Sequence, residues 1–117
     1  MEVQIFGTKK SSETRKAQRF FAERRIKVHF VDLMQRAASP GELRRFVERF
    51  GADALLDREG KRFAELGLRT ALYSDQRWVE RMADDPLLLR QPLVRYGQRL
   101  TVGVDEPTWS RWIEEKK

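Results

Sequence analysis

Two short segments of alternating apolar and polar residues flank a helical pattern in the N-terminal third of the chain. The alternation runs from Val3 to Phe6 and again from Lys27 to Leu33, which is typical of strands. Between these segments, the residues that recur at helical spacing are Thr14, Ala17, Phe20, Phe21 and Arg24. Two strands joined through a helix usually pair in parallel by a right-handed crossover, so this order predicts an α/β sheet.

The middle of the chain predicts helices only. A second helix begins near Ser39 and Pro40 and ends at Gly51. Its apolar residues, at positions i, i+3, i+4 and i+7, are Leu43, Phe46, Val47 and Phe50. Its arginines fall on the opposite face and are expected in solvent; they are Arg44, Arg45 and Arg49. From Asp53 to Pro86 no strand pattern occurs, so we expect a helical insertion over about residues 39–89.

The last third of the chain predicts a hairpin and a closing helix. Two apolar segments, Leu93–Val94 and Leu100–Val104, flank Tyr96-Gly97-Gln98, which favours two antiparallel strands. A final helix follows Asp105, with Trp109, Trp112 and Ile113 on one face and Lys116 and Lys117 at its end.

Length and composition favour one soluble domain. The chain has 117 residues, of which 40% are hydrophobic and 36% charged, and it has no apolar stretch long enough to span a membrane. Its first six residues lack the basic start and long apolar run of a secretory signal. We therefore expect a single domain over residues 1–117, located in the cytoplasm and not in a membrane.

The chain has no cysteine and one histidine, His29. Disulfides, thiolate nucleophiles and cysteine-ligated zinc are therefore excluded, and no histidine cluster is available for a metal site. His29 stands on a predicted strand with no partner ligand, so we expect no metal site.

The net charge of +6 comes mostly from arginines along the whole chain. Arginines interleaved with glutamates are more typical of a solvated surface with ion pairs than of a nucleic-acid site. Binding of nucleic acid is therefore the minority interpretation.

Four segments resemble the arsenate reductase and Spx family in matching order. They are Ile5–Ala17, with a strand, glycine, loop and Arg-Lys-Ala helix; Leu55–Leu68; Asp85–Val94; and the hairpin Gly97–Gly103. The resemblance covers nearly the whole chain. It implies a glutaredoxin-like member of the thioredoxin fold, an α/β protein with a mixed four-stranded sheet and a helical insertion.

The resemblance also implies a site. The family's nucleophilic cysteine falls on Ser11, which is therefore the aligned catalytic position, although it is inert as a serine. The residues implied for binding are Lys10, Ser12, Thr14, Arg58, Arg90, Gln91 and Pro92. The resemblance implies a cis peptide bond before Pro92, an oxyanion or glutathione at the loop of residues 8–14, and glutathione as cosubstrate of a cysteine-containing parent.

This sequence departs from the family at several of these positions. Serine is hardly ionised at neutral pH and is not redox-active, and no histidine stands in the motif to activate it. Spx-type regulators carry a Cys-x-x-Cys pair, which here is Ser11 and Thr14. Gln91 replaces the arginine that usually precedes the cis-proline, and Glu59 falls where another family arginine would lie, so Arg58 and Arg90 are each shifted by one position.

Three interpretations of Ser11 stay open. Serine is a preferred helix N-cap, which accounts for it fully. A serine in place of cysteine is also what an altered, formerly thiol-dependent reductase would carry. Finally, the loop Thr8–Ser12 joins a strand to a helix N-terminus, so we expect it to be a weak anion site, opposed by Glu13.

These observations predict a redox-silent family member that acts by binding or regulation. The first alternative is a glutathione- or thiol-dependent reductase whose cysteine at position 11 has been replaced. The second is an Spx-like transcriptional regulator that binds RNA polymerase or another protein partner.

Overall fold

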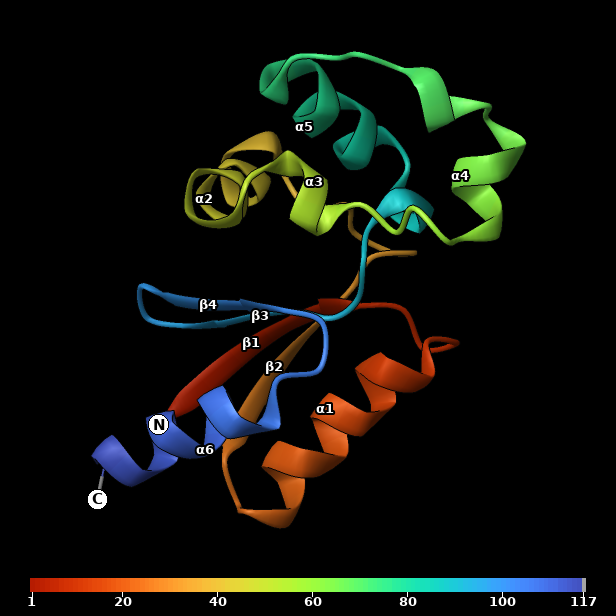
Figure 1. Cartoon of the computed structure of the whole chain (residues 1–117). Coiled ribbons are helices and arrows are strands. Elements are labelled where there is room, and N and C mark those ends of the chain that lie inside the picture. The colour runs from red at the N-terminus through yellow and green to blue at the C-terminus, as the bar shows by residue number, and fades with distance from the viewer. Residues whose placement is uncertain (117) are drawn as a thin grey trace. The chain divides into compact units, whose positions relative to one another are not determined.

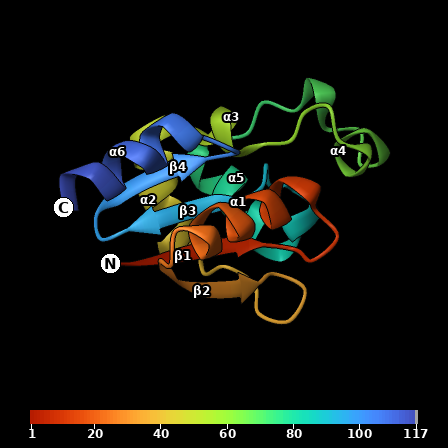
Figure 2. The ribbon, with the colours of Figure 1, turned by 90° about the horizontal axis from the view of Figure 1, so that it is seen from below.

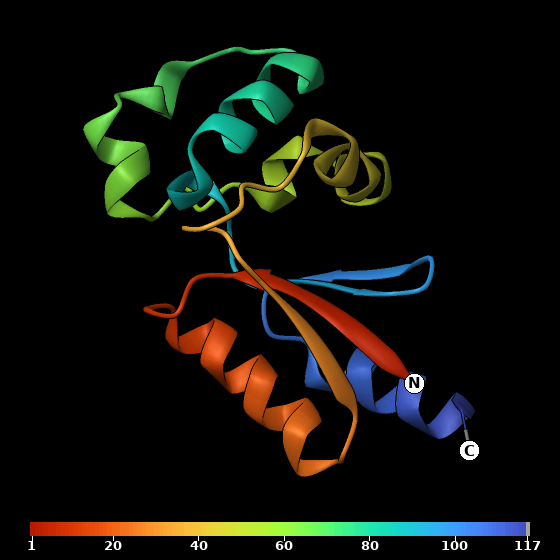
Figure 3. The same cartoon turned by 180° about the vertical axis from the view of Figure 1, so that it is seen from behind.

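Four strands form one mixed sheet (Figure 1). They are β1 (Glu2–Gly7), β2 (Lys27–Asp32), β3 (Leu93–Tyr96) and β4 (Arg99–Val102), in the order β2-β1-β3-β4. β1 pairs with β2 in parallel, whereas β1 with β3 and β3 with β4 are antiparallel. Figure 3 shows β2 at the edge of the sheet beside β1. The predicted mixed four-stranded sheet and its antiparallel hairpin are confirmed.

The computed structural model describes residues 1–116, and these residues form two compact units. The first unit comprises Met1–Asp32 and the residues from Gln91 on, and the second comprises Leu33–Arg90. The second unit is thus inserted between β2 and β3, over a range close to the predicted 39–89. Lys117, one of the two predicted C-terminal cations, lies outside the described residues.

Two helices cover one face of the sheet in the first unit (Figure 2). They are α1 (Ser12–Glu23) and α6 (Glu106–Lys116). The buried core between helices and sheet consists of Val3, Ile5, Ala17, Phe20, Phe21, Val94, Trp109 and Trp112. The indole N–H of Trp109 donates a hydrogen bond to the hydroxyl of Thr101 at 2.8 Å. The apolar faces predicted for both helices therefore form the core, and the one polar atom of Trp109 is satisfied.

The second unit is helical, as predicted. Its elements are α2 (Pro40–Phe50), α3 (Ala52–Leu55), α4 (Lys61–Glu65), η1 (Leu68–Thr70), α5 (Asp75–Asp84) and η2 (Pro86–Leu88). Ser39 caps α2 in a reciprocal capping box with Glu42.

One residue of the predicted apolar face of α2 is not buried. Leu43, Phe46 and Val47 are buried, but Phe50 is 39% exposed. Phe50 is the last residue of α2, and Gly51 then turns the chain away with a φ of 83°. The helical periodicity therefore overestimated the apolar face by one position, because the helix ends there. None of the helices among residues 1–116 is long and apolar enough to cross a membrane.

Candidate functional site

The loop between β1 and α1 starts from a close approach at Gly7. A Cβ atom on Gly7 would lie 2.3 Å from the hydroxyl oxygen of Thr14 and 2.5 Å from its methyl carbon. A residue without a Cβ atom is therefore required for β1 to lie this close to the first turn of α1. Thr14 is fully buried by this approach.

Ser11, the position of the resembled nucleophile, is the N-cap of α1. Its backbone is extended, with φ −74° and ψ 119°, and its Oγ atom accepts a hydrogen bond from the backbone N–H of Thr14 at 3.1 Å. In this geometry a serine satisfies one of the free N–H groups at a helix start. The predicted N-cap is confirmed.

Glu13 occupies the first turn of α1 beside this cap. Its carboxylate accepts hydrogen bonds from the hydroxyls of Ser11 at 3.4 Å and Ser12 at 3.1 Å. The hydrogen bond from its own backbone N–H, and then that from Ser12, hold the pKa of Glu13 below the ordinary 4.5. The positive end of the helix dipole therefore already has a negative charge beside it.

Gln91 ties the start of β3 to this loop. Its side-chain oxygen accepts hydrogen bonds from the backbone N–H of Thr8 at 2.7 Å, the hydroxyl of Thr8 at 3.1 Å and the hydroxyl of Thr14 at 3.2 Å. The peptide bond from Gln91 to Pro92 is cis, as the resemblance implies. The family usually has an arginine at position 91. Here the neutral side chain of Gln91 instead accepts three hydrogen bonds. We call Thr8, Ser11, Thr14 and Gln91 the polar cluster.

The buried polar atoms of the polar cluster have hydrogen-bond partners. Among residues 1–116, no buried side-chain nitrogen or oxygen lacks a hydrogen-bond partner. Ser11 has no histidine beside it, because the single histidine of the chain, His29, lies on β2 and pairs with Gln4 of β1. The arrangement can therefore hold the loop in place, but it offers no activated nucleophile.

The predicted binding residues divide between the two units. Lys10 and Ser12 are exposed in the loop and first turn, and Thr14, Gln91 and Pro92 belong to the same unit. Arg58 and Arg90 belong to the second unit, so their predicted role at the loop stays a prediction.

Both arginines of the second unit have local contacts there. Arg58 forms an ion pair with Asp53 and lies 5.3 Å from the ring centre of Phe63. The backbone N–H of Arg90 donates to the carbonyl of Leu55 at 2.7 Å, and its side chain is exposed.

Thr8 is the residue of the cluster whose role the sequence does not reveal. It is 6% exposed and contributes two of the three donors to Gln91. Its partner lies 83 residues away in the sequence, so no local pattern connects the two. The only sequence signal for this contact is the resemblance, because it implies that the loop of residues 8–14 and Gln91 belong to the same binding site.

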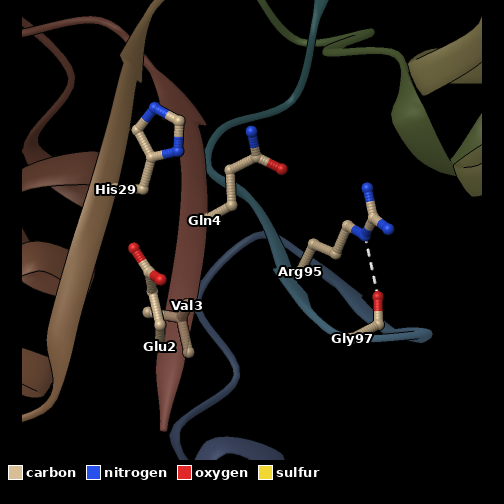
Figure 4. A pocket seen from close by; sticks show the side chains of 6 residues that line it. All are labelled: Glu2, Val3, Gln4, His29, Arg95 and Gly97. Carbon is tan, nitrogen blue, oxygen red and sulfur yellow. Dashed lines mark hydrogen bonds between the residues drawn. The ribbon is translucent and has the colours of Figure 1, made fainter.

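A second candidate is a shallow depression of about 240 Å³ on the sheet (Figure 4). It is lined by Glu2, Val3, Gln4, His29, Arg95 and Gly97. Gln4 lies between His29 of β2 and Arg95 of β3 in the register of the sheet. Arg95 donates to the carbonyl of Gly97 at 2.7 Å, and Glu2 adds a carboxylate to the lining. Because the lining combines acidic, basic, amide and apolar side chains, it does not indicate one class of ligand. Within the described part of the chain, no three His, Asp or Glu side chains are grouped as a metal site.

Comparisons with known proteins agree with the fold. The sequence model of the ArsC family matches residues 6–112. The uncharacterized protein YusI of Bacillus subtilis is 27% identical over 91% of this chain and 93% of its own length. The global transcriptional regulator Spx 2 of Oceanobacillus iheyensis is also 27% identical, over 99% of this chain and 87% of its own.

Solved structures with similar coordinates show the thioredoxin-like fold of this family. The YFFB protein superimposes with a TM-score of 0.86 at 22% identity, covering 93% of this chain and 96% of its own. An arsenate reductase from Vibrio cholerae superimposes with a TM-score of 0.77 at 23% identity, covering 87% and 89%. Identity this low shows the fold alone.

Proposed function

This chain belongs to the ArsC family, and we propose that it acts as a binding or regulatory member of that family without redox chemistry. The observation that carries the proposal is the hydrogen bonding of Ser11. Its Oγ atom accepts from the backbone of Thr14 and donates to Glu13, so the position of the nucleophile has a structural use. The absence of cysteine from the whole sequence supports the same conclusion, because every thiol reductase cycle needs a sulfur nucleophile.

One charged neighbour of Ser11 also opposes a restored thiol. A family nucleophile needs a low thiol pKa, which a helix N-terminus and nearby cations provide. Here the Glu13 carboxylate lies within hydrogen-bond distance of the Ser11 side chain, and a like charge at that distance disfavours a thiolate. Gln91 adds no charge where the family has an arginine to hold an anion.

The rival function is a thiol-dependent reductase whose cysteine at position 11 has been replaced by serine. Turnover of arsenate by Ser11→Cys, with glutathione or a thioredoxin system as reductant, separates the two functions. The matched control is Ser12→Cys, which places an exposed thiol one residue away. We expect the unaltered protein to be inactive and the two cysteine variants to be equally close to the blank.

A Ser11→Cys variant with turnover well above Ser12→Cys would contradict the proposal. It would assign the scaffold to the reductases and leave Ser11 as a replaced nucleophile.

A second candidate is transcriptional regulation through RNA polymerase, and the similarity to Spx 2 over nearly the whole chain favours it. Gel filtration of the purified chain with purified RNA polymerase tests this candidate. Co-elution that survives moderate salt would support it, whereas separate elution at micromolar concentrations would count against it. A cytoplasmic location belongs to both candidates and is equally a proposal.

A further inference from the structure

The positive charge of the chain is concentrated in one segment. Residues 9–27 contain eight Lys or Arg and two Glu, a net charge of +6 that equals the net charge of the whole chain. The remaining residues are therefore neutral in sum. This corrects the interpretation that the net charge comes from arginines along the whole chain. All eight cations are exposed, and we call them the basic ridge: Lys9, Lys10, Arg15, Lys16, Arg19, Arg24, Arg25 and Lys27.

The basic ridge follows α1 and the loops at its two ends. Arg19 follows Arg15 by four residues and Lys16 by three, so it neighbours both on the exposed side of the helix. The opposite face contains the buried Ala17 and Phe21 and packs on the sheet. Lys9 and Lys10 precede the helix, and Arg24, Arg25 and Lys27 follow it. The twelve residues of α1 span about 18 Å, which matches roughly five phosphates along one strand of a duplex.

Few of these cations are neutralised. Lys9 lies 4.0 Å from Asp32, and Lys16 lies 3.8 Å from Glu106 of α6. Among residues 1–116, the other six cations of the basic ridge have no ion pair with a carboxylate. By contrast, arginines of the second unit such as Arg58 and Arg62 pair with Asp53 and Asp85. The basic ridge is thus available to a polyanion.

We propose that the basic ridge binds the phosphate backbone of a nucleic acid, without reading its sequence. An acidic protein partner would need an apolar centre at the interface, and the ridge has none, because Phe20 and Phe21 are buried. The exposed large apolar residues all belong to the second unit; they are Met34, Phe50, Leu72 and Leu87. The ridge likewise exposes no aromatic ring for base stacking. Charge alone is what a phosphate backbone requires.

Arg25 allows a test that is independent of folding. It has a φ of 59°, the left-handed conformation in which glycine is the preferred residue after a helix. Arg25→Gly should therefore raise the Tm by about 2–6 °C while removing one cation of the ridge. A variant that is more stable and binds nucleic acid more weakly has lost a contact and not its fold.

The main experiment measures binding of a labelled duplex of ~20 base pairs and mixed sequence by fluorescence anisotropy, as a function of salt. The test variant carries Arg15→Gln, Lys16→Gln and Arg19→Gln on α1. The matched control carries Arg44→Gln, Arg45→Gln and Arg49→Gln, which removes the same charge from exposed positions of α2. We expect the test variant to lose roughly tenfold or more in affinity and about three units of the log–log salt slope, and the control to lose little.

Three results would overturn the proposal, and a fourth would count against it. The first is an equal loss in both triple variants, which would indicate net charge and not the ridge. The second is a lack of saturable binding of the unaltered protein at ~50 mM salt. The third is tighter binding of polyglutamate than of the duplex, which would assign the ridge to an acidic protein. An Arg25→Gly variant with unchanged affinity would remove Arg25 from the ridge's binding residues and count against the proposal.

Discussion

The hydroxyl of Thr14 donates a hydrogen bond to the side-chain oxygen of Gln91 at 3.2 Å, across 77 residues of sequence. Both positions depart from the family pattern. Spx-type regulators have a cysteine at the position of Thr14, and the family usually has an arginine at the position of Gln91. In this chain the two departures meet in one contact. At these two positions the chain thus has a hydroxyl and a neutral amide that bond to each other.

Gln91→Leu tests this contact. The substitution keeps an apolar stem of similar size but leaves the Thr8 N–H and the hydroxyls of Thr8 and Thr14 without their acceptor. We expect the free energy of unfolding, measured in urea, to fall by about 1–3 kcal/mol. Gln98→Leu, at the exposed turn of the hairpin, is the control and should change it by less than about 0.5 kcal/mol. Equal stabilities of the two variants would show that the cluster contributes nothing.

Gly7→Ala tests the close approach of β1 to α1. The added methyl group would overlap the Thr14 side chain, so we expect a loss of about 1–3 kcal/mol in the free energy of unfolding. Gly41→Ala is the matched control, since the nearest atom to its added Cβ lies 3.9 Å away. In the double variant with Thr14→Ala the two losses should be less than additive. Additive losses would contradict a steric conflict between these two residues.

Most of the fold could be predicted from the sequence, because its signals are local. The alternation in β1 and β2 and the spacing of Trp109 and Trp112 each depend on residues within a few positions. Ser39 with Pro40 likewise marks the start of α2. The error at Phe50 has a related cause, since periodicity shows which face is apolar but not where a helix ends.

The site could be predicted only in part. The cap at Ser11 is local and follows from residue type, and the resemblance supplied the cis bond before Pro92. The contacts of Gln91 with Thr8 and Thr14 join distant segments, so no pattern along the chain indicates them. The basic ridge differs from these contacts, because it is visible in the sequence only as the excess of cations over acidic residues within residues 9–27.

Glu42 should make the second unit sensitive to acid. Burial raises the pKa of Glu42, but hydrogen bonds from Arg36 and from the Ser39 backbone outweigh burial and hold the pKa below the ordinary 4.5. A carboxyl group whose pKa is lower in the folded than in the unfolded state stabilises the protein at a pH above 4.5. This stabilisation is lost as the pH falls through the pKa of the folded state.

Glu42→Gln isolates this charge, since glutamine retains the capping box with Ser39. We expect the unaltered protein to have the higher Tm at about pH 7 and the difference between the two Tm values to shrink as the pH falls below 4.5. Glu48→Gln controls for removal of one negative charge from an exposed site on α2. A Tm difference for Glu42→Gln that is independent of pH would contradict the assignment.

Glu13 should limit anion binding at the loop of residues 8–14. NMR titration of the unaltered protein with sulfate should show weak saturable shifts at the amides of Lys10 to Thr14, in the ~mM range. Glu13→Gln removes the resident charge and should tighten binding about two- to fivefold. Glu23→Gln, at the other end of α1, is the control. Small uniform shifts in all three proteins would mean that Ser11 is only a cap and that the loop binds no anion.

The central claim is that position 11 is a structural cap in surroundings that do not activate a nucleophile. The most direct measurement is the thiol pKa of Ser11→Cys, taken from the pH dependence of its reaction with a small disulfide. We predict a pKa near the ordinary ~8.5 of a free thiol, and a lower value when Glu13→Gln is added. A pKa below ~7 in the single variant, in the range of activated thiols, would contradict the claim.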